Sequence, residues 1–133
     1  MTGKPRTRIY KNRWFAMFAI REGISDATLV AAIEQANRGL IGADLGGGLI
    51  KQRVAREGGG KSGGYRSLVF LRHEQLAIFA FGFAKSDKAN LSVAELKVYK
   101  KAAKIVLALT QAQIDTEVSE ERLFEVNEDA QDL

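Results

Sequence analysis

The middle of the chain constrains the fold most, because three short apolar runs with strand character follow one another there. They span residues 49–55, 65–72 and 76–84 and are rich in Val, Ile, Phe and Tyr, side chains that favour strands. Residues 73–75 are few enough to close a hairpin between the second and third runs. The link between the first two runs is long, and eight of the 13 glycines lie between residues 46 and 64. This spacing predicts a three-stranded antiparallel meander.

Helical patterns lie on both sides of this meander. Residues 12–22 place aromatic side chains at helical spacing, namely Trp14, Phe15 and Phe18. Ser25 is a typical N-cap for a second helix, which stops at Gly39. A later helix begins at Ser92, because Ser92 and Glu95 have the spacing of a capping box.

These elements predict an α+β fold in which an N-terminal helical pair packs on a small twisted antiparallel sheet and a C-terminal helix follows. The sheet has three central strands, with room for a fourth from the N-terminus. A length of 133 residues and a hydrophobic content of 46% suit one globular domain. We expect this domain over residues 1–113 and an acidic C-terminal tail over residues 114–133.

Charge is divided unevenly between these two segments. Residues 1–113 contain 19 Lys/Arg and 8 Asp/Glu, a net charge of +11, and residues 114–133 contain one Arg and 8 acids, a net charge of −7; together they give the +4 of the whole chain. A basic body favours a polyanion such as nucleic acid, although lysine-rich domains without such a partner also occur. The acidic end is either a solvated tail, a cover for the basic surface or a partner-docking segment. Leu123, Phe124 and Val126 would allow a short strand within it.

Composition excludes several classes of site and location. The chain has no cysteine, which rules out disulfides, thiolate zinc sites and cysteine nucleophiles. A single histidine, His73, in the predicted hairpin turn does not favour a histidine-rich metal site. The sequence offers no metal-binding cluster, and we expect neither a metal nor a cofactor. The sequence offers no secretory signal and no membrane span, which favours a cytoplasmic protein without membrane contacts. Gly60, Lys61 and Ser62 do not form a P-loop, because Ala55 stands where the first glycine belongs and a strand follows instead of a helix.

The period of two in a strand predicts which side chains share a face. Lys51 and Arg53 point the same way from the first run. Arg66 shares a face with Leu68, Phe70 and Arg72 in the second run, and Tyr65 points to the opposite face. In the third run the alternation groups Phe79, Phe81, Phe83 and Lys85.

Cations gather on the first two runs and the loop between them. Residues 51–72 contain six cations against the single acid Glu57; the cations are Lys51, Arg53, Arg56, Lys61, Arg66 and Arg72. Such a cluster suits phosphate contacts, and Tyr65 would add a ring for stacking on a base. The alternative is a solvated sheet edge whose charges discourage strand pairing.

The order of these features resembles the RelE/HigB-type toxins of type II toxin–antitoxin modules, in the RelE/ParE superfamily. The likeness rests on GGGLIKQRVAREGGGKSGGYR (residues 46–66) and FGFAKSDKANLS (residues 81–92), and covers about residues 14–109. It implies helices packed on a twisted antiparallel sheet and a ribosome-dependent mRNA interferase. It also implies a cognate antitoxin, commonly a small helix-turn-helix protein, and mRNA on the ribosome as the substrate.

The resemblance assigns catalytic roles to Lys51, Arg53, Arg66 and Lys85. It adds Lys88 to the RNA-binding set of Arg56, Lys61, Tyr65 and Arg72. Members of the family often carry a tyrosine or histidine after the last basic stretch, and here Asn90, Leu91 and Ser92 stand in that place. This departure bears on the proton-transfer step.

Cleavage of this kind uses the RNA 2′-OH as the nucleophile and needs cations to hold the phosphorane, a base and an acid, but no metal. Arg53 and Arg66 suit the phosphorane, because guanidinium groups grip phosphate oxygens bidentately, and Lys51 or Lys85 suits the base. Two other functions fit the same features. One is a ParE-like toxin that acts on a protein such as DNA gyrase, and the other is an inactive module that binds nucleic acid or antitoxin.

Overall fold

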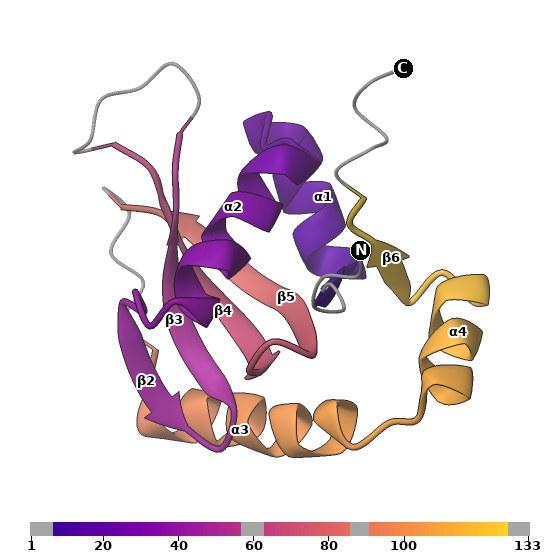
Figure 1. Cartoon of the computed structure of the whole chain (residues 1–133). Coiled ribbons are helices and arrows are strands. Elements are labelled where there is room, and N and C mark those ends of the chain that lie inside the picture. Colours follow the sequence, from indigo (N-terminus) through magenta and orange to yellow (C-terminus); the bar gives the residue numbers. More distant parts are fainter. Residues whose placement is uncertain (1–6, 57–62, 86–90, 128–133) are drawn as a thin grey trace.

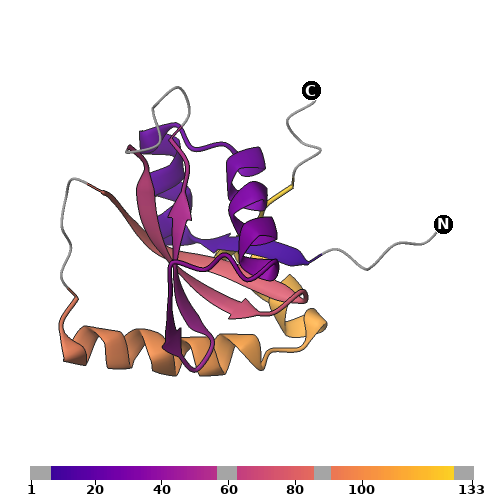
Figure 2. The ribbon, with the colours of Figure 1, turned by 60° about the vertical axis from the view of Figure 1, so that its left-hand side comes forward.

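The computed structural model describes residues 7–56, 63–85 and 91–127 and arranges them in three layers (Figures 1 and 2). Helices α1 and α2 cover one face of a six-stranded sheet, and α3 covers part of the other face. The elements are β1 (Arg8–Asn12), α1 (Arg13–Glu22), α2 (Asp26–Asn37), β2 (Ala43–Gly46), β3 (Leu49–Val54), β4 (Tyr65–Arg72), β5 (Leu76–Ala84), α3 (Val93–Leu107), α4 (Gln111–Ser119) and β6 (Leu123–Glu125).

The strand order is β2-β3-β4-β5-β1-β6. The predicted α+β class, the helical pair and the β3-β4-β5 meander are confirmed, and β1 is the additional N-terminal strand. The sheet is mixed and not antiparallel throughout, because β1 lies beside β5 in parallel. No hairpin joins these two strands, because α1, α2 and the strands β2 to β4 lie between them in the sequence.

Side-chain caps fix the helix starts, as the sequence predicts for α2 and α3. The Ser25 hydroxyl accepts a hydrogen bond from the Thr28 amide at 3.2 Å, and Ser92 forms a capping box with Glu95. Gly23 has a φ of 69° and ends α1 in the left-handed conformation. Thr110 and Gln113 form a second capping box, which starts α4.

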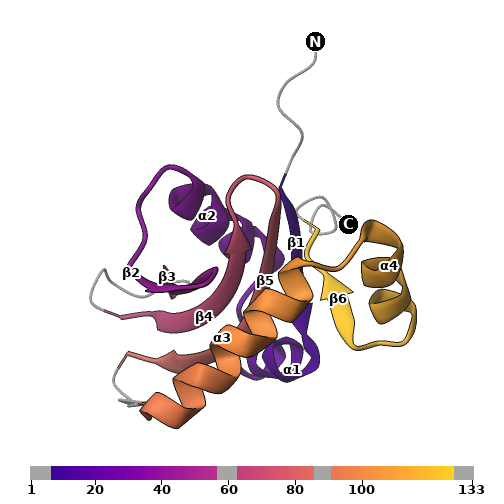
Figure 3. The ribbon, with the colours of Figure 1, turned by 90° about the horizontal axis from the view of Figure 1, so that it is seen from below.

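Two apolar clusters lie on opposite faces of the sheet. Under α1 and α2, the first contains Phe15, Phe18, Leu29, Ile33, Ile50, Val69 and Phe79 among its buried side chains. Against α3 and α4, the second contains Tyr10, Leu49, Leu68, Phe70, Ile78, Ala103 and Ile114. Figure 3 shows α3 crossing the lower face of the sheet obliquely. The strands are therefore apolar on both sides over most of their length.

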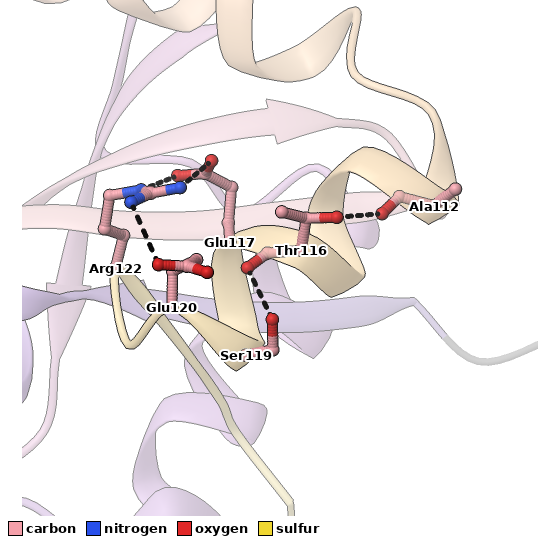
Figure 4. Close-up of polar contacts among 6 residues, drawn as sticks. All are labelled: Ala112, Thr116, Glu117, Ser119, Glu120 and Arg122. Carbon is pink, nitrogen blue, oxygen red and sulfur yellow. Dashed lines mark hydrogen bonds and ion pairs between the residues drawn. The ribbon is translucent and has the colours of Figure 1, made fainter.

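The acidic segment enters the sheet. The boundary expected at residue 113 falls inside α4, and Ile114, Leu123 and Val126 are buried. The short strand that the sequence allows there is β6, which pairs antiparallel with β1. Glu117 accepts two hydrogen bonds from Arg122, at 2.8 and 2.9 Å (Figure 4), and this pairing lowers the pKa of Glu117. Up to residue 127, the segment lies at the β1–β6 edge of the sheet, which is the edge opposite β2 and β3.

A buried amide joins α2 to β3. The Gln52 side chain is 1% exposed and donates to the carbonyls of Ala32 and Leu40, both at 3.0 Å. Its oxygen accepts from the Gly42 amide at 3.2 Å. One side chain thereby satisfies backbone groups of α2 and of the turn that leads into β2.

An extra residue in β5 changes the predicted grouping of its phenylalanines. Leu68 pairs with Phe81 and Val69 pairs with Phe79, so Ala80 is a bulge. Phe79 faces α1 and α2, whereas Phe81 packs on the α3 side. The prediction that Phe79 shares a face with Phe81 and Phe83 is wrong, because one unpaired residue reverses the alternation.

Asn12 holds this bulge. Its amide donates to the Ala80 carbonyl at 3.0 Å, and its side-chain oxygen accepts from the Phe15 amide at 2.8 Å. The same side chain therefore caps α1 and satisfies the bulged residue at the point where β1 ends.

We predict that Gln52→Met lowers the free energy of unfolding by about 2 kcal/mol, because the apolar side chain leaves three backbone groups without their partner. Urea denaturation followed by circular dichroism measures this. Gln75→Met, at an exposed turn position, is the matched control and should change stability by less than about 0.5 kcal/mol. Equal stability of the two variants would contradict the role of Gln52.

Asn12→Asp separates the two functions of Asn12, because a carboxylate still caps α1 but cannot donate to Ala80. We predict a loss of about 1–2 kcal/mol in unfolding free energy at pH 7. Asn12→Ala, which loses both hydrogen bonds, should be less stable still. Relative to wild type, the Asp variant should recover as the pH falls below about 4, where the protonated carboxyl donates again. A pH-independent difference would argue against this hydrogen bond.

Candidate functional site

Two predicted site arginines lie opposite each other in the sheet. Arg53 of β3 pairs with Arg66 of β4, and Arg66 pairs with Phe83 of β5. Directly paired residues of antiparallel strands project from the same face. These three side chains therefore form a transverse row, which we call the arginine row. The next row along the strands contains Lys51, Leu68 and Phe81.

The arginine row lies where the apolar cover from α3 ends. Leu68 is fully buried and Phe81 packs against the α3 cluster, whereas Arg66 and Phe83 are half-buried and Arg53 is exposed. α3 makes its close contacts further along the strands, where a Cβ on Gly48 would lie 2.6 Å from the Leu107 side chain. Arg66 and Phe83 are therefore accessible on the side of the sheet that carries α3, and Arg53, at the β3 edge, also lines a cavity beside α2.

The three strands that carry the arginine row contain basic residues but no acidic ones, so no acid of these strands faces the two arginines. Arg53 donates to the Gly63 carbonyl at 3.3 Å, which places its guanidinium near the start of β4. Lys51 is half-buried. Lys85 is exposed one residue beyond β5, with its amide bound to the Gly64 carbonyl at 3.0 Å. Four cations thus surround one end of the β3-β4-β5 unit.

Tyr65 does not join them. Its ring is 3% exposed on the opposite face, in edge-to-face contact with Phe18 at 5.7 Å between ring centres. Its hydroxyl donates to the Glu22 carboxylate at 3.1 Å. Burial and Glu22 together raise the pKa of Tyr65. The ring that the sequence suggested for base stacking is therefore a core residue in this structure.

The other predicted RNA-binding residues lie apart from the row or outside the described residues. Arg72 is six residues along β4 from Arg66, a separation of roughly 20 Å, and donates to the Leu107 carbonyl at the end of α3, at 2.6 Å. This position suits a cation that binds a helix C-terminus. Arg56 is exposed just after β3. Lys61 and Lys88 lie outside the described residues.

Sequence reasoning missed Tyr99 and Phe83. Tyr99 lies on the sheet-facing side of α3, with its ring 6.1 Å from that of Phe81. Burial, together with the nearby Glu95, raises the pKa of Tyr99. The available signal was the helical spacing of Leu96, Tyr99, Ala103 and Val106, which places Tyr99 on the apolar stripe. Phe83 was missed as a neighbour of Arg66 because the bulge at Ala80 sets the register there, and the alternation of the sequence does not reveal a bulge.

Comparison with protein families assigns the chain. Residues 7–126 match the model of the RelE toxin of the RelE/RelB toxin–antitoxin system. The chain belongs to the RelE toxin family. No curated protein matches the sequence significantly. The family match includes β1, α4 and most of the acidic segment, so it extends beyond residues 14–109 at both ends.

Membership makes this chain a RelE-type toxin of a toxin–antitoxin system, and an antitoxin is the partner that the family implies. Toxins of this family are generally endoribonucleases. The arginine row is therefore located on a scaffold whose relatives act on RNA, and the Lys/Arg composition of the row suits phosphate.

Besides the arginine row, this RelE-family toxin has a cavity at the edge of the sheet. This cavity of about 330 Å³ lies between α2 and the end of β3, and Arg53 is the one charged residue among those that line it. Within the described residues, no group of three or more His, Asp or Glu side chains is placed to hold a metal ion. No helix in the described part of the chain has the length and apolar character to cross a membrane.

Proposed function

We propose that this toxin is an mRNA interferase that cleaves translated messages on the ribosome in the cytoplasm, without a metal cofactor. The arginine row is the main support for this proposal. It sets two arginines directly opposite each other on neighbouring strands, whose backbones lie about 5 Å apart, with Lys51 and Lys85 nearby and no acid on the same strands. A phosphodiester is the anion that such a pair holds best, because each guanidinium offers a planar fork of donors.

In the proposed reaction, the RNA 2′-oxygen attacks the adjacent phosphorus and loses its proton to Lys51 or Lys85. Arg53 and Arg66 hold the non-bridging oxygens while charge builds on the phosphorane. The bond from phosphorus to the 5′-oxygen then breaks, which leaves a 2′,3′-cyclic phosphate and a 5′-hydroxyl. The departing oxygen needs a proton as this bond breaks.

We propose Tyr99 as the donor of that proton. A tyrosine phenol is protonated at neutral pH, which is the state that an acid requires, and burial raises the pKa of Tyr99 further. The Tyr99 ring packs against Phe81. Phe81 lies on the same face of the sheet as the arginine row, in the neighbouring row of paired residues. Tyr99 would then take the role that Asn90, Leu91 and Ser92 cannot fill, since none of these side chains is an effective proton donor.

We predict that Arg66→Ala abolishes growth arrest when the chain is induced alone, because one of the two phosphate-holding groups is lost. The measurement is growth together with mapping of new RNA 5′ ends; wild type should give new ends inside the codons of translated messages. Arg38→Ala, which removes an exposed arginine at the end of α2, is the control and should remain toxic. Arrest with a DNA-damage response and no new RNA ends would favour the ParE-like function.

We predict that Tyr99→Phe slows cleavage by about 10²- to 10⁴-fold while the protein still binds ribosomes, because the ring contact with Phe81 remains and only the phenolic proton is lost. Single-turnover cleavage of a ribosome-bound message measures the rate, and cosedimentation with ribosomes measures binding. A cleavage rate equal to that of wild type would remove Tyr99 from the mechanism.

A further inference from the structure

We propose that Phe83 is a stacking platform for one unpaired base of the RNA, next to the phosphate that Arg66 holds. The inference rests on the proposed function and adds a residue that neither the family match nor the sequence patterns indicate. Its main observation is the register of β4 and β5, which pairs Phe83 directly with Arg66 on one face of the sheet.

Phe83 belongs to a group of rings that extends from the core to the surface. The ring of Phe81 lies 6.3 Å from Phe83, 6.1 Å from Tyr99 and 4.6 Å from Trp14. Tyr99 and Trp14 thus support Phe81 from α3 and α1. Phe83 is the last ring of this group, half-buried beside the arginines, and Phe81 fixes one of its sides by contact.

The strand that carries Phe83 has an open side at this point. β1 pairs with β5 only as far as Phe79, because Asn12 ends β1 and binds the bulged Ala80 carbonyl. Beyond Ala80, β5 has β4 as its one strand neighbour among the described residues. A flat group can therefore approach Phe83 from the side of the sheet edge without displacing a strand.

The chemistry of the row favours a nucleotide over an apolar protein segment. A nucleotide carries an anion and a flat π-face a short distance apart, and the row offers guanidinium groups and a ring on adjacent strands about 5 Å apart. An apolar segment of a partner would use Phe83 but would offer no anion to Arg53 and Arg66. Stacking on an aromatic ring accepts any base, so Phe83 would position the RNA without selecting its sequence.

Binding of a short fluorescein-labelled RNA with 2′-O-methyl groups throughout tests this role without cleavage. Phe83→Leu should weaken binding about 5- to 50-fold, with an unchanged dependence on salt, because no charge is removed. Phe124→Leu is the matched control, since Phe124 is also half-buried but lies on β6, and it should bind within about 2-fold of wild type. Phe83→Trp should keep the affinity of wild type and shows that a ring, and not the fold alone, is needed.

An abasic scan of the same RNA identifies stacking directly. Wild type should lose affinity when one particular base is removed, and Phe83→Leu should be insensitive to that removal. If Phe83→Leu binds as tightly as wild type, or weakens the abasic and intact RNAs equally, the platform is excluded.

Two further outcomes distinguish failure of the stacking platform from failure of the proposed function. If Arg66→Ala also leaves binding and its salt dependence unchanged, this face is not the RNA site. If wild type does not bind the oligonucleotide at all, the platform is excluded, while the mapped 5′ ends in cells still decide whether the chain cleaves mRNA.

Discussion

The hydrogen bond from Asn12 to the Ala80 carbonyl is the contact on which the arrangement of the site depends. At this point β1 ends, α1 begins and β5 gains one residue relative to β4. Before the bulge, β5 alternates so that Phe79 supports α1 and α2; after it, Phe81 and Phe83 turn to the α3 side. Gly82 then faces α1, where a Cβ would lie 2.7 Å from the Phe18 ring. The extra residue thus reverses the alternation of side chains along β5, so this strand contributes aromatic rings to both faces of the sheet.

The two faces of the sheet consequently differ in how they are closed. Two helices cover the first face, and even the polar side chains of Gln52 and Ser67 are buried there, with their hydrogen bonds made within the protein. The single helix α3 crosses the second face obliquely, and its apolar stripe covers Leu49, Leu68 and Phe70 but not the arginine row. An accessible cationic surface is the result of covering a twisted sheet with one straight helix, since one end of the strands extends past the helix.

The sequence predicts the regular parts of this structure well and the irregular parts poorly. The strands at 65–72 and 76–84 and the starts of α2 and α3 follow from composition, alternation and capping residues, which are local signals. Alternation predicted that Tyr65 points to the face opposite Arg66 but not that it is buried, and its contact with Glu22 joins residues 43 positions apart. The bulge and the parallel β1–β5 pair depend on such distant contacts too. The cations of the candidate site were found because a charge cluster is local, whereas Tyr99 and Phe83 become neighbours of that cluster only when α3 and β5 are in place.

Because the acidic segment is folded up to residue 127, the acidic and basic parts of the chain lie in different parts of the molecule. The segment formed by α4, β6 and the turn between them holds five acids at the β1–β6 edge: Asp115, Glu117, Glu120, Glu121 and Glu125. The arginine row lies on the strands β3, β4 and β5. The described acids of this segment therefore do not cover the arginine row, and the net charge of +4 combines a basic body with an acidic C-terminal segment. A polyanion that approaches such a molecule is attracted by the basic surface and repelled by the acidic edge, so the charge distribution orients the protein before any specific contact forms. Ile114, Leu123 and Val126 fix this polarity, because their burial makes the acidic segment a part of the sheet.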